Sequence, residues 1–254
     1  MKNHPYVLTI AGFDPSGGAG ITADVKTFEA LKVYGLSVCT ANTIQNDIDF
    51  KACFWIDIDV IKKQIEVLCN RFKITHVKIG IVQHWKILNE IIDILIEKNK
   101  EIKIILDPII RSSTHFSFQE ISPKPESVHQ LDKVLDKIYL LTPNYQEIEK
   151  LYVDKSIQET IDHIKKKTNI LLKGGHRTDV IGKDELFMKN GSHFTLNPKR
   201  QNIYEKHGSG CVLSSAITAN LALGFPLLKS CYRAKKYTEN FLGSNKSLLG
   251  YHSM

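Results

Sequence analysis

The 254-residue sequence lacks the features that define several classes of protein. It has five cysteines, an odd number, and no two are spaced as C-x-x-C, so neither a zinc site nor a disulfide framework is expected. No apolar run is long enough to span a bilayer, and no charged-then-apolar leader opens the chain. Reduced thiols without an export signal predict a cytoplasmic protein with no membrane partner.

A phosphate-binding loop of the G-x-x-x-x-G-K-[ST] type is also missing, so any ATP would have to be bound without that loop. Lysine and arginine exceed aspartate and glutamate by 34 − 27 = 7. These basic residues form short runs in helical patterns, such as Lys62-Lys63 and Lys235-Lys236, which is typical of solvated helix faces. With no RNP, KH or zinc-finger pattern either, we expect no nucleic-acid partner.

The sequence does contain an alternation of apolar strands and amphipathic helices. Predicted strands cover residues 6–11, 35–45, 74–79, 102–106, 138–141 and 170–172, and predicted helices cover 21–32, 57–72, 85–97, 211–223 and 228–242. Apolar strands that alternate with helices predict a mostly parallel sheet covered on both faces. Asn190-Gly191, a strong hairpin signal, adds an antiparallel edge. We therefore predict a single α/β domain over residues 1–254.

Polar residues and glycines follow most of the predicted strands. They are Gly12, Gln45, Asp107-Pro108, Thr142-Pro143-Asn144 and Lys173-Gly174-Gly175. In sheets of this kind, ligands bind beyond the carboxyl ends of the strands. We therefore expect these residues to meet in one crevice.

The first of two glycine-rich loops runs from Gly12 to Gly20. Its end and the next helix match G-x-G-x-x-A at Gly18–Ala23, the dinucleotide-binding fingerprint, which makes a nicotinamide-dependent oxidoreductase a distant alternative. The loop is several residues too long for that tight turn, and the next strand ends in Gln45-Asn46 rather than in an acid. A loop whose backbone approaches a small ligand closely is the other interpretation.

The second glycine-rich loop is Gly208-Ser209-Gly210-Cys211, and its last residue, Cys211, is the first residue of the predicted helix 211–223. The backbone N–H groups and the positive dipole end of such a start can hold phosphate oxygens or a developing anion. The same residues would also suit a glycine-containing turn without a binding role before a core helix, with Cys211 as a small buried apolar residue. The residues alone leave both interpretations open.

Six segments, in order, resemble the hydroxymethylpyrimidine and phosphomethylpyrimidine kinases, the thiamine-synthesis members of the ribokinase-like superfamily. They are GFDPSGGAGITADVKTFEALKVYGLSVCTANTIQND, VKIG, LDPII, LTPNYQEIEKL, LLKGGH and HGSGCVLSSAITANLALG. The resemblance runs from about Val7 to Lys235. It implies a ribokinase-like three-layer α/β/α sandwich, the cofactors ATP and Mg²⁺, and phosphorylation of 4-amino-5-hydroxymethyl-2-methylpyrimidine and then of its monophosphate. Pyridoxal kinases of the same branch share most of these segments, so a pyridoxal or pyridoxine kinase is the alternative.

The resemblance also implies roles for individual residues. The polar pair that contacts the pyrimidine corresponds to Asp24 and Gln45, and the pocket would be lined by Gly12, Ala19, Thr43, Ile81 and Ile109. The magnesium and phosphate network corresponds to Asp107, Asn144 and Glu147, with Mg²⁺ held by Asp107 and Glu147 largely through water. The basic residues beside the nucleotide correspond to Lys173 and Lys235. The anion hole and candidate catalytic base correspond to Gly208, Ser209, Gly210 and Cys211.

Several of these residues also have simpler interpretations. Asn144 and Asp107 suit turn or cap positions, and Asp24 suits the first turn of a helix. The amide of Gln45 both donates and accepts hydrogen bonds, so it suits a pyridoxal ring as well as a pyrimidine. Arg111 follows the Asp-Pro segment, where the family has a small or apolar residue, and either reaches a phosphate or lies on the surface.

Many relatives carry aspartate at the position of Cys211. A free thiol has a pKa of about 8.5, but a helix N-terminus can lower it to roughly 3.5–7.5. We therefore expect the anion hole to make Cys211 a thiolate that accepts the proton of the substrate hydroxymethyl group. By analogy with relatives, we also expect a homodimer.

Overall fold

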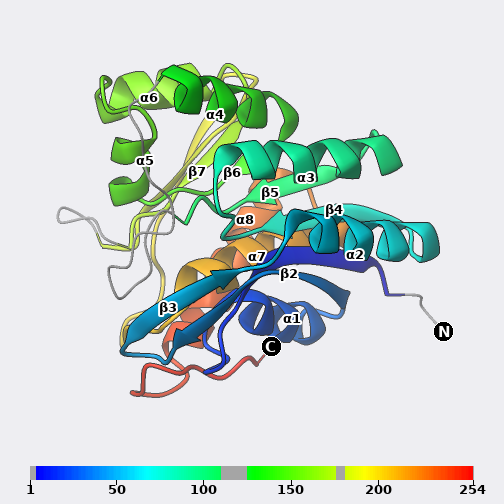
Figure 1. The fold of residues 1–254 in the computed structure, drawn as a ribbon. Coiled ribbons are helices and arrows are strands. Elements are labelled where there is room, and N and C mark those ends of the chain that lie inside the picture. The colour runs from blue at the N-terminus through cyan, green and yellow to red at the C-terminus, as the bar shows by residue number, and fades with distance from the viewer. Residues whose placement is uncertain (1–3, 110–124, 176–180, 254) are drawn as a thin grey trace.

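A computed structural model describes residues 4–109, 125–175 and 181–253, and its fold is shown in Figure 1. These residues contain one nine-stranded sheet in the order β3-β2-β1-β4-β5-β6-β7-β8-β9. The strands are β1 (Tyr6–Phe13), β2 (Tyr34–Gln45), β3 (Phe50–Trp55), β4 (Ile74–Ile79), β5 (Lys103–Leu106), β6 (Leu140–Leu141), β7 (Asn169–Leu172), β8 (Asp184–Phe187) and β9 (His193–Leu196). The strands from β2 to β7 in this order are parallel, as predicted.

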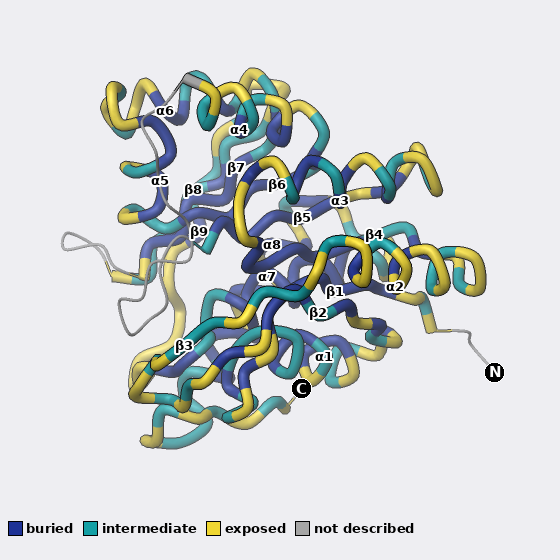
Figure 2. Tube along the Cα trace, viewed as in Figure 1, coloured by how far each residue is buried: buried dark blue, intermediate teal, exposed yellow. Residues whose placement is uncertain are grey.

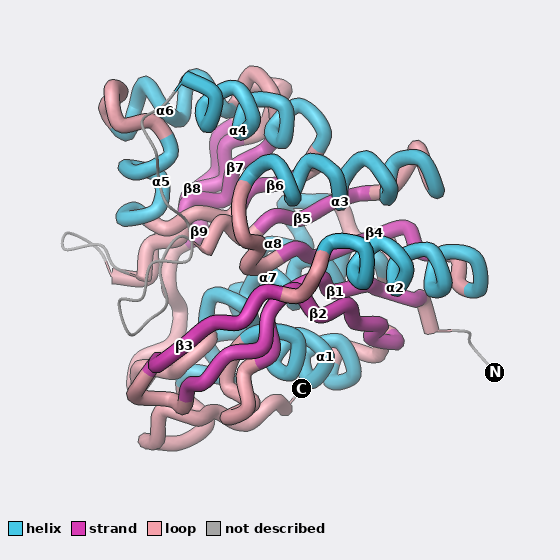
Figure 3. Tube along the Cα trace, viewed as in Figure 1, coloured by secondary structure: helices cyan, strands magenta, loops and turns pink. Residues whose placement is uncertain are grey.

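Antiparallel strands close both ends of the sheet. At one end β8 and β9 form the predicted hairpin, and Gly191 in its turn has a φ of +89°. At the other end β3 pairs with β2, as Figure 3 shows, and this strand was not predicted. None of its residues is buried, and its mostly apolar sequence, FKACFW, does not alternate between apolar and polar residues as a half-buried strand would.

Two groups of helices cover the two faces. One face carries α1 (Gly20–Ala30), α7 (Ser209–Ala222) and α8 (Leu227–Leu242); the other carries α2 (Ile58–Arg71), α3 (Trp85–Lys98), α4 (Pro125–Lys137), α5 (Tyr145–Leu151) and α6 (Ile157–Ile164). The last three were not predicted. Among the residues that the structure describes, no helix has the length and apolar character needed to cross a membrane.

Alternation along the strands places the core on both faces of the sheet. In β5, Ile104 and Leu106 pack against the α2–α6 layer, whereas Ile105 packs against the α7–α8 layer. Figure 2 shows the buried strands between helices whose outer sides are exposed. The three-layer α/β/α sandwich is thus confirmed, and the carboxyl ends of its parallel strands lie at one edge.

Candidate active site

A cavity of about 760 Å³ opens at the carboxyl ends of the parallel strands. This volume suits a small-molecule site. Every residue that the resemblance assigned to the site lines it except Asp24: Gly12, Ala19, Thr43, Gln45, Ile81, Asp107, Ile109, Asn144, Glu147, Lys173, Gly208, Ser209, Gly210, Cys211 and Lys235. Arg111 lies outside the described residues. The predicted crevice therefore exists, because residues from distant strand ends meet in it.

The two glycine-rich loops pack directly on each other at the wall of the cavity. A Cβ on Gly208, whose φ is +73°, would lie 2.0 Å from the carbonyl oxygen of Gly18. A Cβ on Gly18 would lie 2.6 Å from Cδ2 of His207, and Nε2 of His207 is 2.9 Å from Oδ2 of the buried Asp14. Neither Asp14 nor His207 was singled out in the sequence. Both are buried polar residues, which spacing alone does not reveal.

Asp14 also shows why the first loop is no dinucleotide site. Its carboxylate accepts the N–H groups of Ser16 and Ala19, each at 2.8 Å, and Ala19 is the N-cap residue of α1. A carboxylate therefore stands at the helix start where the fingerprint would place a pyrophosphate. The structure gives the nicotinamide alternative no support.

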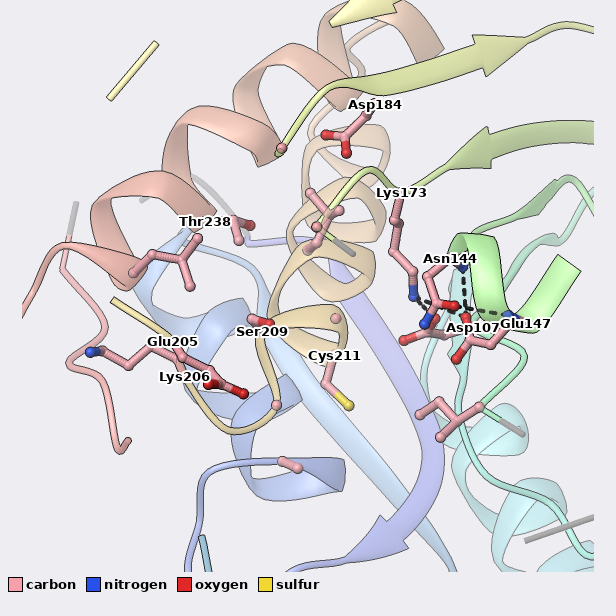
Figure 4. Close-up of a pocket in the computed structure, with 18 of the residues that line it drawn as sticks. Asp107, Asn144, Glu147, Lys173, Asp184, Glu205, Lys206, Ser209, Cys211 and Thr238 are labelled. Carbon is pink, nitrogen blue, oxygen red and sulfur yellow. Dashed lines mark hydrogen bonds and ion pairs between the residues drawn. The ribbon is translucent and has the colours of Figure 1, made fainter. Parts of the chain in front are cut away.

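Helix α7 begins at Ser209, two residues before its predicted start, with Gly208 as the N-cap in the left-handed region. The first N–H groups of a helix have no partner within it, and here they line the cavity. This arrangement can hold an anion through backbone N–H groups and the helix dipole. Figure 4 shows Ser209 and Cys211 at this helix start, facing the cavity.

Opposite the helix start lies a cluster of buried charges. Lys173 Nζ is 2.6 Å from Asp107 Oδ1 and 3.6 Å from Glu147 Oε2. Asn144 and Glu147 form a capping box at the start of α5: Asn144 Oδ1 accepts the N–H of Glu147 at 2.8 Å, and Glu147 Oε2 accepts the N–H of Asn144 at 2.7 Å. The capping interpretation of Asn144 is thus correct, and the same box aims Glu147 at Lys173 (Figure 4).

The charges of this cluster set its protonation states. Burial raises the pKa of Glu147 to about 7, against the opposing effect of Lys173, and the charge of Asp107 adds to the rise. Burial also acts to raise the pKa of Asp107, but Lys173 and Lys78 outweigh it and hold that pKa below its usual range. Burial acts to lower the pKa of Lys173, but the two carboxylates raise it overall. The site therefore keeps a charged lysine beside an ionised aspartate and a glutamate that titrates near neutral pH.

Cys211 does not have the low pKa that its place at a helix start predicts. Burial raises the pKa of the thiol to about 11, and the charges of Asp24 and Asp107 add to the rise. Lys78 and the backbone N–H of Gly20 act in the opposite direction but do not outweigh it. The expectation of a thiolate at neutral pH is therefore wrong, because loss of hydration exceeds the stabilising contacts.

Asp24 lies outside the cavity lining, although the resemblance assigned it to the substrate. It is fully buried, and its carboxylate pairs with the ammonium of Lys78, with Nζ 2.8 Å from Oδ2. Lys78 itself lines the cavity. In the sequence Lys78 is one residue of the segment VKIG, and a lysine inside a strand gives no sign of its partner.

The far end of the cavity, lined by α8, is polar. Lys235 Nζ lies 2.8 Å from Asp184 Oδ2 and also donates to the carbonyl of Gly182. Thr238, one turn further along α8, is buried and lines the cavity (Figure 4). Lys235 is thus held by an acid of β8 rather than being a freely mobile charge.

The cavity, the anion-holding helix start and the lysine–carboxylate cluster on a three-layer α/β/α sandwich define the class of the protein as a kinase of the ribokinase-like type. The family model described as phosphomethylpyrimidine kinase matches residues 14–253. The chain belongs to the phosphomethylpyrimidine kinase family, and it is a phosphotransferase.

Individual relatives agree with the family. The chain is 35% identical over 248 residues to the hydroxymethylpyrimidine/phosphomethylpyrimidine kinase of Haemophilus influenzae, covering 93% of this chain and 90% of the relative. It is similar to the crystal structure of phosphomethylpyrimidine kinase from Clostridium difficile 630, with 34% identity, a TM-score of 0.72 and coverage of 92% and 97%. A pyridoxal kinase from Staphylococcus aureus in complex with pyridoxal has a TM-score of 0.81 at 23% identity, over 97% of this chain and 90% of that one, which shows a shared fold.

Proposed function

We propose that this kinase uses ATP to phosphorylate the hydroxymethyl group of 4-amino-5-hydroxymethyl-2-methylpyrimidine and then phosphorylates the monophosphate, in thiamine biosynthesis. The observation that carries the proposal is one cavity in which the start of α7 faces the Asp107–Lys173–Glu147 cluster. Phosphoryl transfer needs mainly positioning and neutralisation of charge, and these two elements supply both. Relatives that share a third of the sequence carry this activity in their names.

Each part of the cavity has a task in this reaction. The N–H groups of Gly210 and Cys211 hold oxygens of the transferred phosphoryl group, and Lys173 neutralises its charge. Gln45 and the apolar side chains of Ile81 and Ile109 orient the heterocycle. Cys211 lies at the helix start (Figure 4), and its thiolate form is the candidate acceptor of the hydroxymethyl proton.

Mg²⁺ fits the acidic side of this cluster. Asp107 and Glu147 are buried carboxylates with one lysine between them; burial raises the pKa of Glu147, and repulsion from Asp107 adds to the rise. A divalent cation would relieve that repulsion, and carboxylate oxygens with water are the ligands that Mg²⁺ prefers. The described residues contain no group of three or more His, Cys, Asp or Glu side chains able to hold a metal. Asp107 and Glu147 would thus hold it largely through water, and it would neutralise phosphate oxygens.

A kinase assay with Mg-ATP tests the proposal directly. 4-Amino-5-hydroxymethyl-2-methylpyrimidine, its monophosphate and pyridoxal are supplied in parallel, and ADP release and product mass are measured. We expect both pyrimidines to be phosphorylated with a kcat/KM at least tenfold above that for pyridoxal. Preference for pyridoxal would overturn the proposal in favour of the alternative, because Gln45 suits either ring.

We further propose a homodimer in a reducing, cytoplasmic compartment. Apolar side chains are exposed on and beside β2 and β3: Phe13, Ile44, Ile48 and Phe54. Such side chains favour contact with a second copy of the chain. All five cysteines are free thiols, which suits a reducing compartment. Sedimentation analysis at micromolar concentration tests the dimer, and a monomer would overturn it.

A further inference from the structure

The ion pair between Lys78 and Asp24 is the most deeply buried in the part of the chain that the structure describes. Both side chains have no exposed area. Nζ of Lys78 lies 3.0 Å from Oδ1 and 2.8 Å from Oδ2 of Asp24. The pair joins β4 to α1, and Lys78 projects from the face of β4 opposite to that of Val77 and Ile79, which pack against the other helical layer.

Hydrogen bonds fix the carboxylate of Asp24 from two further elements. Thr9 of β1 donates to Oδ2 at 2.6 Å, and Ser215 of α7 donates to Oδ1 at 2.6 Å. Side chains of three elements, β1, β4 and α7, therefore hold this carboxylate of α1. This carboxylate holds the ammonium of Lys78 in a single place, so that the cation cannot move away during a reaction.

Stability alone does not account for such a pair. Removing two charges from water costs several kcal/mol, and well-packed apolar residues of the same volume are often as stable. A functional reason for the pair is available because Lys78 lines the cavity. A Cβ on Gly80 would lie 3.1 Å from Lys78 Nζ, so the absence of a side chain there leaves room for the ammonium.

The charged groups around Cys211 come from every element that meets there. They are Lys78 on β4, Asp24 on α1, Asp107 after β5 and Lys173 after β7. Both carboxylates oppose a thiolate. Lys173 is held by Asp107 and Glu147. Lys78, paired with Asp24, lines the same cavity as Cys211, and its charge favours the thiolate.

We propose that Lys78 is a positioning residue of the reaction, whose fixed ammonium stabilises the thiolate form of Cys211 that accepts the substrate proton. In that step the proton moves from the hydroxymethyl oxygen to Sγ of Cys211. The oxygen forms a bond to the γ-phosphorus, and the bond from that phosphorus to the bridging oxygen breaks, which leaves ADP. The proposal rests on the proposed function for the identity of this substrate, but the charge relation between Lys78 and Cys211 does not depend on it.

The test compares variants that separate charge from folding. Lys78→Met alone would leave a buried carboxylate unpaired and risks unfolding. The double variant Asp24→Asn/Lys78→Met removes both charges, and the amide of asparagine keeps hydrogen bonds to Thr9 and Ser215. Thr218→Ala is the matched control, because it removes one buried hydrogen bond of α7, from Oγ1 of Thr218 to the carbonyl of Ser214, and keeps both charges. Folding of each variant is checked by thermal unfolding.

The first readout is alkylation of Cys211 by iodoacetamide from pH 7 to 10, followed by mass spectrometry of its peptide. A shift of one pKa unit changes the thiolate fraction tenfold below the pKa. We expect the double variant to react at least tenfold more slowly than wild type at each pH. Thr218→Ala should match wild type, because both charges and the hydrogen bonds to Asp24 are unchanged.

The second readout is steady-state kinetics with the hydroxymethyl substrate that the wild type accepts. We expect kcat of the double variant to fall at least tenfold, with the KM values for ATP and substrate changing less than threefold. Wild-type alkylation rates and kcat in a folded double variant would overturn the proposal and make the pair purely structural. Alkylation needs no substrate, so it decides the role of Lys78 even if neither pyrimidine nor pyridoxal is phosphorylated, which would overturn only the proposed function.

Discussion

The thiol of Cys211 lies at a helix start, which favours its anionic form, but it is also buried, which opposes that form. With a pKa of about 11, only a small fraction of the thiol is ionised near neutral pH. A base acts in its deprotonated form, and that fraction grows tenfold per pH unit below the pKa. Chemistry that uses this thiol therefore has a pH dependence of predictable sign.

We expect kcat to rise with pH from about 7 to 10 if Cys211 accepts the proton and chemistry limits the rate. Cys211→Ala should lower kcat by at least about 100-fold and remove the slope, because general-base roles contribute about 10²–10⁴-fold. Steady-state kinetics over this range check both expectations. Cys231→Ala is the control: Cys231 is also buried, in α8, but does not line the cavity, so its slope should be unchanged. A flat wild-type profile with a tenfold or smaller effect of Cys211→Ala would contradict the role.

Glu147 makes the stability of the protein depend on pH. Its pKa of about 7 in the folded state lies above the ordinary value of 4.5, so the folded state binds more protons than the unfolded chain between these values. Stability contributed by the protonated form is present in full below about pH 4.5 and is lost as pH rises through 7.

Glu147→Gln should therefore gain stability over wild type above pH 7, by on the order of 1 kcal/mol or more. Glutamine keeps the capping box with Asn144, so the start of α5 is preserved. Urea unfolding at pH 5 and pH 8 gives the comparison. Glu159→Gln, in the exposed capping box of α6, is the matched control and should show no such gain. Equal stability of Glu147→Gln and wild type at pH 8 would argue that the glutamate is ionised at little cost.

At the scale of elements, the position of α7 depends on contact between two loops that are far apart in sequence. Gly208 is the N-cap residue of α7, and its backbone meets that of Gly18 and Ala19 in the first loop. The pair Asp14–His207 joins the same two loops. The anion-holding N–H groups are therefore placed by the packing of loop on loop.

Gly208→Ala should destabilise the protein by more than about 1–2 kcal/mol and lower kcat at least tenfold. The added Cβ costs about that much in the left-handed region and also meets backbone of Gly18 that cannot yield as a flexible side chain would. Gly191→Ala has a similar φ of +89° but open space around it. This control should show only the conformational cost and keep full activity in thermal unfolding and kinase assays. Equal activity of the two variants would show that the loop contact does not position α7.

At the scale of the whole molecule, one sheet carries the first glycine-rich loop and the lysine–carboxylate cluster, and α7, which packs on the same sheet, carries the second loop. The strands β1, β4, β5, β6 and β7 are continuous neighbours in that sheet. Binding at their shared edge therefore stabilises the whole sheet rather than a separate part. If the chain is a single domain, as predicted, a ligand bound at this edge should shift one unfolding transition of the whole protein.

ATP at about 100 times its Kd should add about 2.7 kcal/mol to the free energy of unfolding. For a domain of roughly this size, each kcal/mol raises Tm by about 2–4 °C, so we expect a rise of roughly 5–10 °C in a single transition. Calorimetry with and without Mg-ATP measures it. Two transitions, of which only one moved with ATP, would contradict the single domain.

The order of elements and the meeting of strand ends could be derived from the sequence because they depend on local periodicity. The nearly all-apolar run at residues 102–106 and the strand pattern at 74–79 predict neighbouring parallel strands, and the residues after them must lie at one edge. Asn190-Gly191 predicts its hairpin because these two residues readily adopt the positive φ that a two-residue hairpin turn requires. β3 escaped prediction because no side of it is buried, so its stability comes from pairing with β2.

The sequence by itself determined the mostly parallel sheet and its crevice, since these follow from patterns of neighbouring residues, and its resemblance to a known family implied the three-layer sandwich and most of the lining. Only the tertiary structure decided the electrostatic state of the site. Which charge faces which depends on residues far apart in the chain, as in Lys78 with Asp24 and Asp14 with His207. The protonation of the Cys211 thiol also depends on residues far apart in the chain. The sequence predicts the helix start that favours a thiolate, but the burial that outweighs it arises only when strands and loops pack around the thiol.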